Sequence, residues 1–275
     1  MNLSNFDWKT YLAKIQRQSY FAIGALIFIF FCVCAGGVWY YIQQKEEAKE
    51  AAKKLAEQEL ANNVKRINDY YTSILSGASP QKTIAILIAI RQSSVPLSLS
   101  GFNLDTYNCD VTNCTFSYIT EDNKIFNTQE INFFGKDYKA NVSEKGLEYQ
   151  VEPSPLDDDS FLKKYDLRQS ISVADCSELV NYVQSFNSLK SDSKEKIVLS
   201  GYPDSSISAI ESILPEVKSK YGFKTVQWST TLSDDILRIS SFLNRQAYSE
   251  SFRINKIEKK KSSEIEVSGK LLCAI

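Results

Sequence analysis

The pattern of hydrophobic and polar positions begins with one long apolar stretch. The run from Tyr20 to Ile42 carries no charged residue. At about 1.5 Å per residue, a helix of this length spans about 34 Å, enough to cross a hydrocarbon core of about 30 Å. Aromatic residues stand at both of its ends, as in the interfacial belts of membrane helices. We therefore expect residues 20–42 to form a transmembrane helix. A signal peptide cleaved near Val33–Ala35 is the alternative, and the apolar run that continues to Ile42 argues against it.

Residues 43–76 predict one continuous helix, because they contain no Gly or Pro and are rich in strong helix formers. Its second half has an apolar stripe with the alternating spacing of three and four that is typical of a coiled-coil seam. The stripe consists of Leu60, Val64, Ile67, Tyr71 and Ile74. Two readings remain open: a stalk whose stripe meets a partner helix, and a single amphipathic helix lying on its own domain. Continuity with the predicted membrane helix favours the stalk.

Residues 77–151 predict a short helix that is opened by Ser79-Pro80 and runs through Ile90. A β-rich region follows, with alternating apolar residues that begin at Leu97 and Leu99. Cys109 and Cys114 flank a four-residue loop. In a hairpin with such a loop the two cysteines lie opposite each other, within disulfide distance. We expect a structural disulfide. A redox site would normally use a C-x-x-C spacing, which this loop lacks.

The C-terminal part, residues 171–275, alternates helical and strand patterns after a proline-bearing polar linker at 152–170. Its last strand is the clearest, with apolar residues on one face from Ile265 to Ile275. An α+β fold with helices on one face of an antiparallel sheet accounts for this pattern. Cys176 and Cys273 both fall on core-facing positions, either as two buried thiols or as a second disulfide.

Composition limits the chemistry. The chain of 275 residues contains no histidine, which excludes histidine-based catalysis and histidine metal sites. The formal net charge of −1 gives no basic field for nucleic acid. Because no glycine-rich phosphate loop or nucleophile elbow is present either, we expect a non-enzymatic protein without cofactor or metal.

The cysteines also indicate an orientation. A disulfide between Cys109 and Cys114 places the C-terminal bulk outside the reducing cytoplasm, so residues 1–19 become a cytoplasmic stub. In this stub, Phe6 and Trp8 stand among basic residues. Either the stub lies on anionic lipid, or Phe6 and Trp8 anchor it to a cytoplasmic protein.

This arrangement resembles the PilO-like inner-membrane proteins of bacterial type IV pilus and type II secretion machines. The resemblance is carried by the stretch from Pro96 to Leu104 with Cys109-x4-Cys114 and Tyr118, and by the C-terminal pattern from Trp228 to Leu271. It implies a single-pass inner-membrane protein with a periplasmic coiled-coil stalk and a ferredoxin-like α+β domain at 171–275.

The resemblance also implies a function, as a scaffold or alignment component needed for type IVb pilus biogenesis. The expected partners are a second copy or a sister platform protein at the stalk, and a cytoplasmic platform protein at the stub. The longer type IVb members carry a large cytoplasmic domain, so residues 1–19 suggest the shorter versions. Other classes are a bitopic sensor, a scaffold of another envelope complex such as type II secretion or division, and a periplasmic thiol enzyme using Cys109 and Cys114. The short stub argues against the sensor.

Overall fold

The computed structural model describes the backbone of residues 8–120, 130–143, 146–191, 195–214, 221–260 and 263–274. Helix α1 runs without interruption from Trp8 to Leu75 and contains residues 43–75 of the helix predicted for 43–76. Phe6 lies outside the described residues, as do the side chains of residues 8–27, including Trp8. Among the side chains that are described, no helix is apolar over a sufficient length to cross a membrane. The chain divides into two compact units, residues 1–63 and 64–275.

The second unit is a mixed α+β structure built on a large antiparallel sheet, as the sequence predicts. Its helices are α2 (Pro80–Leu99), α3 (Ser160–Asp166), α4 (Cys176–Ser188), α5 (Ser208–Ile213) and α6 (Ile236–Asn244). The strands of the large sheet are β1 (Phe102–Asp110), β2 (Cys114–Thr120), β5 (Asn141–Ser143), β6 (Gly146–Val151), β7 (Val198–Leu199), β8 (Lys224–Ser233), β9 (Phe252–Lys259) and β10 (Glu264–Cys273). Strands β3 (Ile131–Phe133) and β4 (Lys136–Tyr138) form a separate hairpin.

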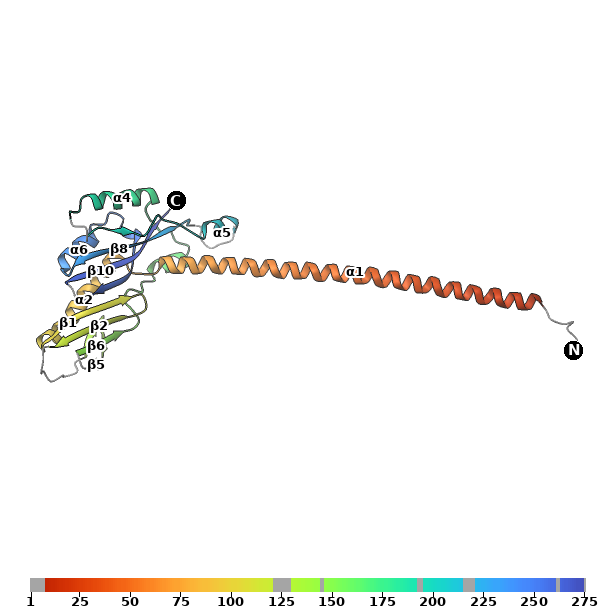
Figure 1. Ribbon diagram of the computed structural model, residues 1–275, viewed down its shortest axis with the longest axis horizontal. Coiled ribbons are helices and arrows are strands. Elements are labelled where there is room, and N and C mark those ends of the chain that lie inside the picture. The colour runs from red at the N-terminus through yellow and green to blue at the C-terminus, as the bar shows by residue number, and fades with distance from the viewer. Residues whose placement is uncertain are drawn as a thin grey trace. The chain divides into compact units, whose positions relative to one another are not determined.

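The sheet joins two regions that the sequence suggests are separate. Its strand order is β5-β6-β2-β1-β9-β10-β8-β7, with every neighbouring pair antiparallel. Strand β1 from the β-rich region pairs with β9 from the C-terminal region, so regions 77–151 and 171–275 share one sheet (Figure 1). The predicted linker at 152–170 contains helix α3 and packs against this same unit.

Strands β7 to β10 and their helices have a recognisable connectivity. The chain leaves β8, passes through α6 and returns as β9, with β10 lying between β8 and β9. This is a split β-α-β arrangement. Helix α4 lies beside α6, where the rings of Phe186 and Phe242 meet edge to face at 5.5 Å.

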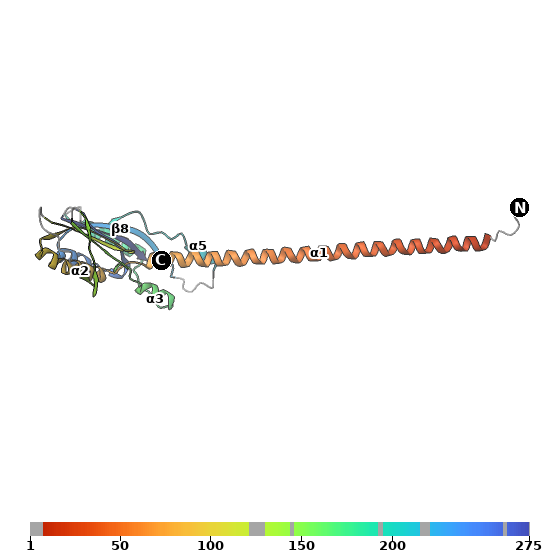
Figure 2. The same ribbon diagram turned by 90° about the horizontal axis from the view of Figure 1, so that it is seen from below.

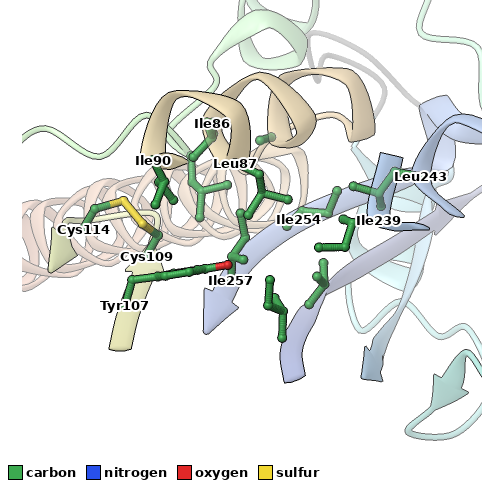
Figure 3. Close-up of a cluster of buried hydrophobic side chains, with 14 of the residues drawn as sticks. Ile86, Leu87, Ile90, Tyr107, Cys109, Cys114, Ile239, Leu243, Ile254 and Ile257 are labelled. Carbon is green, nitrogen blue, oxygen red and sulfur yellow. A yellow bond between two sulfur atoms is a disulfide. The ribbon is translucent and has the colours of Figure 1, made fainter. Parts of the chain in front are cut away.

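The main core lies between these helices and one face of the sheet. Figure 3 shows Ile86, Leu87 and Ile90 of α2 directed toward Ile254 and Ile257 of β9. Helix α6 contributes further apolar side chains to the same cluster, and α2 extends along the sheet in Figure 2. Gly269 of β10 is required where β10 pairs with β9, because a Cβ there would stand 1.9 Å from the carbonyl oxygen of Arg253.

Helix α2 is longer than the sequence predicts. Apolar alternation at Leu97 and Leu99 indicated the start of a strand, but both residues belong to the last turn of α2. Pro96 is tolerated inside this turn, and Ser100 closes it by donating its N–H to the carbonyl groups of Pro96 and Leu97.

Two disulfides are present. Cys109 and Cys114 are bonded across the β1–β2 hairpin, directly opposite each other in the register, which confirms the predicted pair. Cys176 and Cys273 are also bonded, which decides between the two readings of these residues. The second bond fastens the first turn of α4 to the end of β10.

The two disulfides are expected to differ in their effect on stability. The separation between cysteines is 5 residues for Cys109–Cys114 and 97 for Cys176–Cys273. Loop-closure entropy then assigns about 2 kcal/mol to the first bond and about 4.7 kcal/mol to the second. Replacing Cys176 and Cys273 together by Ala should therefore lower the free energy of unfolding more than the same replacement of Cys109 and Cys114. Denaturant unfolding followed by circular dichroism measures both values. An equal loss would contradict the prediction.

Candidate functional site at the end of helix α1

A second apolar cluster fastens the end of α1 to the sheet. Ile67, Tyr71, Ile74 and Leu75 of α1 are 0–2% exposed and pack with residues of α3, β10 and the segments before α5 and β8. Leu272 of β10 belongs to this cluster, whereas its neighbours Leu271 and Cys273 belong to the main core. Since successive residues of a strand point to opposite faces, the end of α1 packs on the face of the sheet opposite the main core.

Tyr71 is the centre of this second cluster. Its ring stacks on Tyr165 at 4.9 Å and meets Phe223 edge to face at 6.2 Å. Its hydroxyl donates a hydrogen bond to a carboxylate oxygen of the buried Glu211. Burial, followed by this hydrogen bond, raises the pKa of Tyr71 well above its ordinary value, so the phenol stays protonated and continues to donate.

The last carbonyl groups of α1 are bound by side chains from strands distant in the sequence. Lys270 Nζ donates to the carbonyl oxygen of Ser73 at 2.7 Å, and the Arg253 guanidinium donates to the carbonyl oxygen of Gly77 just beyond the helix. The last turn of α1 has no basic residue of its own. These two cations therefore compensate the negative end of the helix dipole and satisfy carbonyl groups that lack helical partners.

Arg253 is the most unusual residue of this junction. Its side chain is 1% exposed, lies 4.2 Å from the centre of the Phe161 ring, and approaches the Asp158 carboxylate at 3.8 Å. Burial lowers its pKa to about 10, which leaves it charged at neutral pH. A buried cation needs such partners, because desolvation without them is very costly. Backbone bonds between Ala78 and Ile254, each 2.8 Å from N to O, continue the same connection.

The burial of the apolar stripe of α1 contradicts part of the prediction that this stripe meets a partner helix. Ile67, Tyr71 and Ile74 of the apolar stripe lie inside the core of their own domain, so they are not available to a partner helix. Leu60 is 42% exposed, and Val64 is half-buried. Because a coiled-coil spacing and an amphipathic face look alike over two heptads, the sequence could not distinguish these cases. What remains for a partner is the segment N-terminal to Val64, including Leu60 and the exposed Leu55.

A second candidate is a cavity of about 260 Å³ between α2, α6 and the sheet, whose charged residues are paired with one another. Arg91 approaches Asp234 at 2.6 Å, and Lys259 approaches the other oxygen of the same carboxylate at 2.8 Å. Tyr107 lines this cavity, and burial raises its pKa, so it remains neutral. Within the described part of the chain, no group of three potential metal ligands is present. The paired charges connect α2 and β9 with the segment just before α6, and none of the three is left as a free base or nucleophile.

The predicted disulfide between Cys109 and Cys114 is buried in the domain. Cys109 and Cys114 are 0% exposed, and the hydroxyl of Ser154 lies 3.8 Å from the sulfur of Cys114. A buried disulfide offers no sulfur to an attacking thiolate, so this environment does not suit thiol exchange.

Comparison with known proteins adds no assignment: no family model, no curated protein and no solved structure matches this chain.

Arg253 provides the most direct mutational check of the junction. Arg253→Leu should lower the free energy of unfolding by about 2–3 kcal/mol, because it removes a charged hydrogen-bond donor from a buried carbonyl group. Arg66→Leu is the matched control, since Arg66 is an exposed residue of α1. Denaturant unfolding of the full chain in detergent, followed by circular dichroism, measures both. A loss of the same size in both variants would show that the junction contributes nothing specific.

Proposed function

We propose that this chain is a non-enzymatic scaffold subunit of a membrane-bound assembly, and specifically a PilO-like inner-membrane component of a type IVb pilus assembly platform. The observation that carries the proposal is the construction of the helix end. Helix α1 terminates inside the core of an α+β domain, where Glu211 accepts a hydrogen bond from Tyr71 and where Arg253 and Lys270 bind the last carbonyl groups. A helix that ends in this way cannot turn relative to its sheet without breaking buried contacts. Such a connection suits a protein that holds a domain in a set orientation.

In the proposed topology, residues 20–42 of α1 cross the inner membrane and the N-terminus is cytoplasmic. The support for this is the uncharged run in the sequence with aromatic residues at its ends. The two disulfides favour an oxidising compartment for residues 64–275, which in a bacterium is the periplasm. Phe6 and Trp8 would then be positioned to contact a cytoplasmic platform protein.

The connectivity of the sheet supports the narrower part of the proposal. The strand order β9-β10-β8-β7 with α6 and α4 supports a ferredoxin-like unit within the larger sheet, with its chain permuted so that a helix comes first. This is the domain type implied by the PilO-like resemblance. Fold alone does not define function, so the pilus assignment rests on this likeness together with the predicted anchor and stalk.

The first test is deletion of the gene with complementation. If the chain is part of the assembly platform, cells without it should lack surface pili by electron microscopy, and the intact gene should restore them. Normal piliation in the deletion strain would contradict the proposal. A lost transcriptional response in normally piliated cells would instead favour a sensor.

A second test examines orientation. Inserting two alanines between Leu55 and Leu60 turns the following helix by about 200°, whereas inserting seven residues turns it by about 20° while making it longer by about 10 Å. If the orientation of the domain relative to its stalk partner matters, the short insertion should abolish piliation and the long one should preserve it, at equal protein level. Full piliation with the short insertion would show that orientation is not transmitted through α1.

A further inference from the structure

An open groove is lined by residues at the C-terminal end of α4 and by residues of α6. It has a volume of about 530 Å³, and Phe186, Leu232 and Phe242 provide much of its apolar lining. Phe242 is only 6% exposed and Leu232 only 3%, so this lining is part of the packed domain. The groove therefore has a formed apolar floor and does not require the domain to open.

Two large apolar side chains border this hollow without being covered. Leu189, just after α4, is 86% exposed, and Leu237, in the first turn of α6, is 78% exposed. Single exposed leucines are common on protein surfaces. Leu189 and Leu237 both line the same hollow, so their uncovered apolar surface lies beside its apolar floor.

The charges around the groove are predominantly positive. Lys190, Arg238 and Arg245 line it together with one carboxylate, that of Glu195. Lys190 pairs with Glu195 at 3.1 Å and lies over the Phe186 ring at 5.2 Å. The Nε atom of Arg238 lies 3.9 Å from a carboxylate oxygen of Asp235, which makes a long ion pair. Among the described residues Arg245 forms no ion pair, so it is available to a carboxylate from outside.

We propose that the α4–α6 groove binds a segment of a partner protein in which one or two large apolar side chains lie next to carboxylates. The apolar side chain would lie on the floor that Phe186, Leu232 and Phe242 form together, beside Leu189 and Leu237. The neighbouring carboxylates would meet Arg245 and Arg238 at the rim. Nucleic acid is a poorer occupant, because it requires a longer track of cations than these three and little apolar floor.

The groove lies on the helical side of the sheet, whereas the junction of α1 lies on the opposite face. The proposal therefore does not depend on the function proposed above. A protein with either role could use this surface, and the test below measures binding without reference to pili.

The test selects short random peptides displayed on phage against the full chain in lipid nanodiscs, with empty nanodiscs as the background. The enriched peptides should contain Leu, Phe or Trp beside Asp or Glu. A synthetic copy of an enriched peptide should bind about tenfold or more weakly to Leu237→Ser and to Arg245→Glu, as measured by fluorescence anisotropy.

Two control variants make the same kinds of substitution at exposed positions outside the groove. Leu167→Ser changes a leucine that is 67% exposed after α3, and Lys136→Glu reverses a charge on the β3–β4 hairpin. Both should bind the peptide as the unchanged chain does, and circular dichroism with mass analysis of the two disulfides verifies that all four variants are folded. The proposal is overturned if no peptide exceeds the background, if the enriched peptides lack acidic residues, or if they bind equally to the groove and control variants. Self-association of the chain that Leu237→Ser abolishes would also overturn it, by identifying a second copy as the occupant.

Discussion

The buried guanidinium of Arg253 is the constraint on which the junction of this protein depends. A cation that is 1% exposed must be compensated on several sides, and here the carbonyl group of Gly77, the Asp158 carboxylate and the Phe161 ring supply that compensation. These partners come from the end of α1, the segment before α3, and α3 itself. Because Arg253 is part of β9, the contacts that compensate its charge hold the helix end, α3 and the sheet together.

The two apolar clusters pack on opposite faces of the same sheet. Phe252 and Ile254 face the main core, and Arg253 between them faces the junction. Strand β10 repeats the alternation, with Leu271 on one side and Leu272 on the other. Both apolar clusters therefore pack on the same strands, from opposite faces. The disulfide from Cys176 to Cys273 adds a covalent connection at the end of β10, close to Leu272.

Much of this fold could be predicted from local pattern. The alternation from Ile265 to Cys273 defines β10, and the four-residue loop between Cys109 and Cys114 defines a hairpin and its disulfide. The absence of Gly and Pro from residues 43–75 defines the C-terminal part of α1. The partner of the α1 stripe could not be predicted, because an apolar helical face does not specify whether it meets another chain or its own domain. Arg253 and Lys270 could not be recognised either, since the sequence Phe252-Arg-Ile254 has the ordinary appearance of a half-exposed strand. Their acceptors lie 176 and 197 residues away along the chain.

The central claim is that the last turns of α1 belong to the folded domain, and amide hydrogen exchange of the full chain in nanodiscs tests it most directly. If the claim holds, the amides of residues 67–75 exchange as slowly as those of β9 and β10, because they open only when the sheet does. The amides of residues 46–60, whose side chains are exposed, should exchange much faster. Exchange at residues 67–75 that is as fast as at residues 46–60 would show that the helix end is only loosely attached, and would contradict the account.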